Sequence, residues 1–171
     1  MAKVLESWID IKENDYDDFL DMAIDWFGFF SLVWLDSRKF DDSAAQIKQD
    51  LRNHEICRRR ATHWPGTRYM QNADTPKADI ITFRLDVASR KILARPKSLF
   101  SWREPAYLED LAFYKKDGQL GFATSSHESI AWAVDTDFGW SLPKRLDFTD
   151  SKSDEDGWKN YTAYGDGAVK L

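Results

Sequence analysis

The pair His127-Glu128 is the part of the sequence best suited to proton transfer or metal binding. A zinc-binding helix of the HExxH type carries a second histidine four residues after the first, so that both imidazoles lie on one helical face. Here the segment reads HESIA, and Ala131 stands where the second ligand would be. The sequence therefore predicts no metal site and no cofactor. A turn or capping role for His127 is the simpler interpretation. A small enzyme in which His127 exchanges protons with Asp110 or Glu128 is the alternative, because imidazole titrates near neutral pH.

Nucleophile and phosphate-binding motifs are missing from the sequence. It contains neither the GxSxG motif of hydrolases nor a P-loop. Cys57 is the single cysteine, which excludes an internal disulfide and a CxxC metal site. The neighbouring arginines could increase the reactivity of its thiol, but a half-buried strand cysteine is the simpler interpretation. We therefore expect a protein without catalytic residues.

The run Arg58–Arg60 is the one basic cluster, with Arg52 and Arg68 nearby. Guanidinium groups bind phosphates and carboxylates in a bidentate manner, so nucleotide or nucleic-acid binding through Arg58–Arg60 is a third hypothesis. The whole chain has 24 basic and 29 acidic residues and a net charge of −5, which argues against nucleic acid as the main ligand. We prefer the interpretation that these arginines pair with an acidic first helix or with the acidic tail.

Acidic residues are concentrated near the two ends of the chain. Residues 1–36 carry 2 basic and 9 acidic residues, whereas residues 37–104 carry 15 basic and 8 acidic ones. The fold can neutralise such a chain internally, or it can leave opposed patches that attract a charged partner. We expect an acidic surface that binds a basic protein, with a tryptophan in a turn as an apolar contact. The candidate partner-binding residues are Asp15, Asp17, Asp18, Asp21, Asp25, Trp64, Asp154, Glu155 and Asp156.

The elements that would position these residues follow from the hydrophobic pattern. Apolar residues recur with helical spacing from Asn14, the expected N-cap, to about Gly28, and a second helix is predicted over 42–53, capped by Asp42 or Ser43. Aromatic and β-branched runs predict strands at 29–36, 55–62, 79–85, 90–95, 111–115, 120–125 and 130–134. An Asp-Gly pair predicts a hairpin at 116–119, and connections this short favour antiparallel pairing. The predicted class is α+β, a mostly antiparallel sheet of about six strands with two N-terminal helices packed on it.

Length and composition fit one domain. A chain of 171 residues with 43% hydrophobic and 31% charged residues is typical of a single folded domain over 1–171. Residues 147–171 combine acidic, glycine and aromatic residues, and we expect a partly mobile tail held by its aromatic side chains. The longest apolar run, 27–35, is too short to span a membrane, and the N-terminus has no signal-peptide core. We expect a cytoplasmic location; the oligomeric state stays open.

Three stretches together resemble a known class of proteins. They are SLVWLD at 31–36, WPGT at 64–67 and LEDLAFYKKDGQLGFATSSHESIA at 108–131. In this order they resemble small bacterial immunity-type proteins, which accompany secreted polymorphic toxins, over about half of the chain. The resemblance implies a single α+β domain that binds and blocks a cognate toxin without catalysis of its own. It carries over no interface residues, so the predicted binding surface rests on charge.

Overall fold

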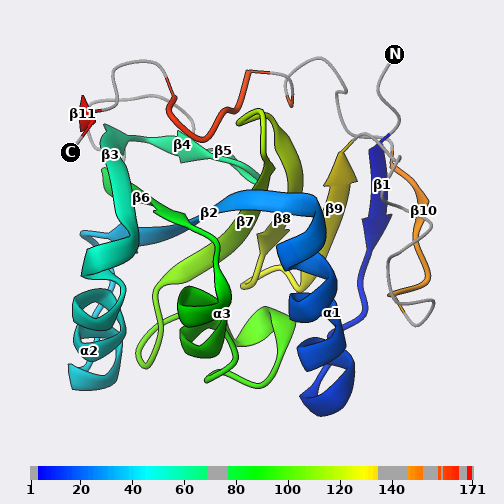
Figure 1. Cartoon of the computed structure of the whole chain (residues 1–171), viewed down its shortest axis with the longest axis horizontal. Coiled ribbons are helices and arrows are strands. Elements are labelled where there is room, and N and C mark those ends of the chain that lie inside the picture. The colour runs from blue at the N-terminus through cyan, green and yellow to red at the C-terminus, as the bar shows by residue number, and fades with distance from the viewer. Residues whose placement is uncertain are drawn as a thin grey trace.

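Strand β2 (Phe27–Leu35) lies in the interior of a large antiparallel sheet (Figure 1). The structure is a computed structural model, which describes residues 4–68, 77–134, 146–151, 158, 160–165 and 169–170. The other strands of this sheet are β1 (Val4–Ser7), β3 (Glu55–Ala61), β6 (Ala78–Arg84), β7 (Glu109–Lys115), β8 (Leu120–Ser125), β9 (Ile130–Val134), β10 (Thr149–Asp150) and β11 (Val169–Lys170). Among the described residues the strand order is β10-β1-β9-β8-β7-β2-β6-β3-β11. Strands β4 (His63–Trp64) and β5 (Thr67–Arg68) form a separate hairpin.

The helices of the described residues gather in the lower half of the view in Figure 1. They are α1 (Glu13–Trp26), α2 (Asp42–Asp50) and α3 (Val87–Leu93), with 3₁₀ turns η1 (Arg52–His54) and η2 (Leu99–Ser101). Both predicted helices are present, but their caps differ from the prediction. Helix α1 follows Lys12 without a side-chain cap, and Asp41 caps α2 by accepting hydrogen bonds from Ser43 N at 2.8 Å and Ala44 N at 3.2 Å.

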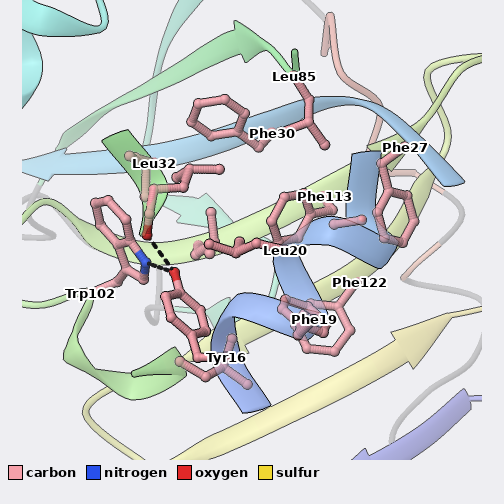
Figure 2. Packing of buried hydrophobic residues seen from close by; sticks show 14 of the residues in the cluster. Tyr16, Phe19, Leu20, Phe27, Phe30, Leu32, Leu85, Trp102, Phe113 and Phe122 are labelled. Carbon is pink, nitrogen blue, oxygen red and sulfur yellow. Dashed lines mark hydrogen bonds between the residues drawn. The ribbon is translucent and has the colours of Figure 1, made fainter. Parts of the chain in front are cut away.

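Helix α1 supplies the centre of the core between the helices and the sheet. Its residues Tyr16, Phe19, Leu20 and Ala23 are fully buried, at the helical spacing that the sequence predicted. Figure 2 shows the Tyr16 ring beside Trp102, whose Nε1 donates to the Tyr16 hydroxyl at 2.9 Å. That hydroxyl donates in turn to Leu93 O at 2.8 Å. The polar atoms that α1 brings into this core therefore have partners, as burial requires.

Successive residues of β7 point to opposite faces of the sheet, as a strand dictates. Phe113 packs in the helix-side core against Phe19 at a ring-centroid distance of 5.7 Å. Ala112 and Tyr114 point to the other face, into a cluster that we call the second core. The second core consists of the buried residues Val4, Ala112, Tyr114, Leu120, Ala123, Ile130, Trp132, Val134, Trp158 and Ala163. Each face of the sheet thus has its own apolar cover.

The α+β class is confirmed, but the sheet is larger than predicted. Nine strands of the described residues join it, because β1, β10 and β11 bring segments near both ends of the chain onto the sheet. The strand predicted at 90–95 is wrong, since this segment belongs to α3 and the turn after it. A capping box explains the difference: Asp86 Oδ1 accepts from Ser89 N at 2.8 Å, and Ser89 Oγ accepts from Asp86 N at 2.9 Å.

The described parts of 147–171 pack against the sheet. Strand β10 pairs with β1, β11 pairs with β3, and Trp158 and Ala163 are buried in the second core. The candidate residues Asp154, Glu155 and Asp156 lie outside the described residues. None of the helices in the described part of the chain has the length and apolar character needed to cross a membrane.

Candidate functional site

Two consecutive carboxylates of β7, Glu109 and Asp110, line one cavity of about 230 Å³. In a regular strand they would point to opposite faces. The pairing with β2 shifts at this point, because Ser31 lies opposite Ala112 while Val33 lies opposite Glu109. This β-bulge places one extra residue on β7, and Asp110 takes a positive φ of 48°. Bulges redirect side chains in this way, so both acids reach the same cavity.

Asp110 fixes the β4–β5 hairpin to the sheet. Its carboxylate is buried and accepts hydrogen bonds from Trp64 Nε1 at 2.8 Å, Thr67 Oγ1 at 3.2 Å and Ser126 N at 2.9 Å. Burial raises the pKa of Asp110, and these hydrogen bonds oppose the rise. Because the Asp110 carboxylate accepts three hydrogen bonds, we assign it a structural role.

Glycine is required at the tip of this hairpin. Gly66 has a φ of 83°, and a Cβ there would lie 2.7 Å from Trp132 Cζ3 and 3.1 Å from Thr124 O. Because Gly66 has no side chain, the hairpin can lie close to β8 and β9. This close packing buries Trp64. Trp64, a candidate partner-binding residue, is only 2% exposed, because its indole packs inward to reach Asp110, so it does not offer an apolar contact on the surface.

Glu109 forms the other half of the site with His127. Its Oε2 lies 2.9 Å from His127 Nε2, and the two side chains are 3% and 35% exposed. Burial raises the pKa of Glu109, and the hydrogen bond to His127 opposes that rise. Arg38 and Glu104 complete the surroundings: Arg38 Nε lies 3.1 Å from Glu104 Oε2 and 3.9 Å from Glu109 Oε1.

The sequence pointed to the right histidine but to the wrong carboxylate. The alternative enzyme hypothesis gave His127 the partners Asp110 or Glu128, whereas the structure pairs it with Glu109. Strand alternation hides this contact, because a regular β7 would carry only one of Glu109 and Asp110 to the cavity. The available signal was the presence of two adjacent acids in the otherwise apolar strand LEDLAFY. Chemically, a buried carboxylate on a solvent-accessible imidazole can transfer a proton, or it can share a bound cation.

The predicted acidic residues of α1 lie on its exposed side, and α3 pairs with two of them. Arg90 Nη1 lies 3.2 Å from Asp17 Oδ1, and Arg90 Nη2 lies 2.8 Å from Asp21 Oδ1. Asp15 is half-buried, whereas Asp18 and Asp25 are exposed. Within the described ranges no lysine or arginine pairs with Asp18 or Asp25.

Two arginines of the cluster, Arg58 and Arg60, form ion pairs with acidic residues in or next to the sheet. Arg58 Nε lies 2.8 Å from Glu55 Oε1, and Arg60 pairs with Asp36 and, at 3.1 Å, with Asp79. The preferred partners, the acidic helix and the tail, were therefore wrong for Arg58 and Arg60. Pairing across adjacent strands explains this outcome, since Arg60 lies directly opposite Asp79 on β6.

Large apolar side chains are exposed at both ends of α1. Trp8 is 62% exposed in the segment that leads into the helix, and Trp26 is 39% exposed in its last turn. The sequence prediction did not include either residue in the binding surface.

No family model, no curated protein and no solved structure matches the chain.

Proposed function

We propose that the protein is a non-catalytic binding protein of the immunity type, which acts in the bacterial cytoplasm and neutralises a cognate secreted toxin. In this proposal the exposed side of α1 binds a basic surface of the partner. The observation that carries it is the charge of this helix: residues 13–26 include six acidic and no basic residues. Arg90 pairs with Asp17 and Asp21, while Asp18 and Asp25 remain exposed.

The exposed carboxylates of Asp18 and Asp25 are not expected to stabilise the helix. Like charges three or four residues apart on a helix repel each other, and Asp25 lies near the C-terminus, where the helix dipole disfavours an anion. A positively charged partner would offset both effects. Its approach would be accelerated by long-range attraction and slowed by salt.

The aromatic residues at the ends of α1 support the same surface. Protein interfaces combine a few buried aromatic contacts with a polar or charged surrounding. Trp26 is exposed in the last turn of α1, and Trp8 is exposed in the segment before the helix. We therefore extend the proposed interface from the carboxylates to these two tryptophans.

The test uses the full chain and two double variants with the same change in charge. Asp18→Asn/Asp25→Asn removes two acids from α1, and Asp42→Asn/Glu128→Gln removes two exposed acids elsewhere. The tagged proteins are used to capture partners from source cells and their secreted fraction, and association rates are then measured at low and high salt. We expect a basic partner whose low-salt association slows on the order of several-fold with the α1 variant only. Co-expression of the chain should suppress the toxicity of that partner.

Two results would overturn the proposal. If both variants associate as fast as the wild type at low salt, α1 is not the binding surface. If the captured partner is not toxic, or if the chain captures none, the immunity function is wrong.

A further inference from the structure

We infer that Glu104, Glu109 and His127 bind a divalent transition-metal ion, for which Zn²⁺ is the model ion. One ligand atom from each side chain can be chosen so that all three lie within 4.8 Å of one another. They come from three places in the chain: the loop before β7, the first residue of β7 and the turn between β8 and β9. The inference does not depend on the proposed function, because α1 contributes no ligand.

The spacing of the ligand atoms suits a small ion. Two ligands bound at 2.0–2.2 Å to a tetrahedral ion are about 3.4 Å apart. Glu109 Oε2 and His127 Nε2 are 2.9 Å apart, so a small side-chain movement would admit the ion between them. His127 and Glu109 also line the cavity of about 230 Å³, which provides a path for entry.

A second observation comes from Glu104 itself. Its Oε2 is buried and accepts no hydrogen bond from the described residues. Arg38 Nε is close, at 3.1 Å, yet it makes no hydrogen bond within the described part of the chain either. Arg38 Nε and Glu104 Oε2 therefore form an ion pair without hydrogen-bond geometry, and a coordinated cation could take the place of the guanidinium at this oxygen.

The charge of the cavity also favours an additional cation. Glu109, Asp110 and Glu128 line it, and Glu104 lies beside Glu109, whereas Arg38 is the one permanent cation of its described lining. Asp110 already accepts three hydrogen bonds, so it is not counted as a ligand. An ion of charge +2 would bring the cluster close to neutrality.

The ligand types select the kind of ion. One imidazole nitrogen and two carboxylate oxygens suit Zn²⁺ or Mn²⁺, whereas Mg²⁺ prefers an all-oxygen set. Three protein ligands leave at least one position for water. On binding, His127 Nε2 would donate its lone pair to the ion.

Titration of metal-stripped full-length protein with Zn²⁺, followed by calorimetry, tests the inference. We expect one Zn²⁺ per chain, no comparable binding of Mg²⁺, and at least about tenfold weaker Zn²⁺ binding in Glu109→Gln and in His127→Ala. His63→Ala, which removes an exposed histidine elsewhere, is the matched control and should bind Zn²⁺ like the wild type.

The role of Arg38 provides an independent readout. Arg38→Gln should bind Zn²⁺ more tightly, because the guanidinium and the ion compete for Glu104 and Glu109. If Glu109→Gln fails to fold, His127→Ala still tests the site, since this side chain is 35% exposed. The inference is wrong if the wild type binds no Zn²⁺, or if Glu109→Gln and His127→Ala leave the single site unchanged.

Discussion

Tyr114 carries a hydroxyl group into the second core, where Ser31 Oγ lies 3.0 Å from it. Burial raises the pKa of Tyr114 to about 12 and raises the pKa of Tyr16, in the helix-side core, as well. The folded chain therefore holds these protons more tightly than the unfolded chain does. Their contribution to stability is complete below about pH 10, the unfolded value, and is lost as the pH rises toward the folded value.

Replacing this tyrosine should flatten the alkaline loss of stability. Between pH 9 and pH 11, Tyr114→Phe should lose about 1 kcal/mol less of its free energy of unfolding than the wild type loses. At neutral pH the variant should be less stable by about 1 kcal/mol, since Ser31 Oγ loses its partner. Urea denaturation at both pH values measures the difference. Tyr164→Phe, which removes an exposed hydroxyl, is the control; an equal flattening there would disprove the assignment to burial.

At the residue scale, the candidate site also shows how far its chemistry could be predicted from single residues of the sequence. His127 was identified from the sequence because imidazole titrates near neutral pH, yet its contact with Glu109 was not predicted. A metal site was rejected because no second histidine stands four residues away. That rule applies to ligands on one helix. The ligands inferred here come from three segments, so their spacing along the chain carries no information about their distance in space.

At the scale of elements, two glycines occupy tight turns with positive φ but have different surroundings. Gly66 has a φ of 83°, and a Cβ there would lie 2.7 Å from Trp132 Cζ3. Gly118, in the predicted β7–β8 hairpin, has a φ of 90°, and the nearest atom to a Cβ would be 3.8 Å away. Replacement by alanine therefore causes backbone strain alone at Gly118, but backbone strain together with a steric conflict at Gly66.

We expect the two alanine variants to differ in stability. Gly118→Ala should destabilise the protein by about 1 kcal/mol, the cost of a positive φ in a residue with a Cβ. Gly66→Ala should cost about 2–4 kcal/mol, because it also forces the β4–β5 hairpin away from Trp132 and disturbs the Trp64–Asp110 hydrogen bond. Chemical denaturation gives both values. Equal losses would mean that the hairpin is free to shift without cost.

The elements that the sequence predicted well are those with long, unambiguous patterns. Strands at 120–125 and 130–134 have the predicted bounds, and the first helix was displaced by one or two residues at its ends. The segment 90–95 was misassigned because its few apolar residues fit either a strand or a short helix. Its start signal, Asp86 followed by Ser89, is a capping box with serine in place of the usual glutamate. Strands β1, β10 and β11 have four residues or fewer and depend on long-range pairing.

At the scale of the whole molecule, some charged side chains form ion pairs within the fold, whereas others remain exposed on the surface. Arg58 and Arg60 of the sheet and Arg90 of α3 use their charge in ion pairs within the described structure. Asp18 and Asp25 of α1 make no such pair within the described residues, and the chain as a whole has a net charge of −5. When surface charges are selected for binding a charged partner, the free protein is expected to be less stable than it would be with charges selected for its own stability.

This argument predicts that removing the exposed acids stabilises the free protein. Asp18→Asn/Asp25→Asn eliminates the like-charge spacings 15–18, 18–21 and 21–25 and removes an anion from the last turn of α1. We expect a gain of about 1 kcal/mol at low salt, from about 0.2–0.5 kcal/mol for each spacing, and a smaller gain at high salt, where the repulsion is screened. Urea midpoints at two salt concentrations measure it, with Asp42→Asn/Glu128→Gln as the charge-matched control. A loss of stability in the α1 variant would show that these carboxylates support the fold, and their exposure would then no longer argue for a basic partner.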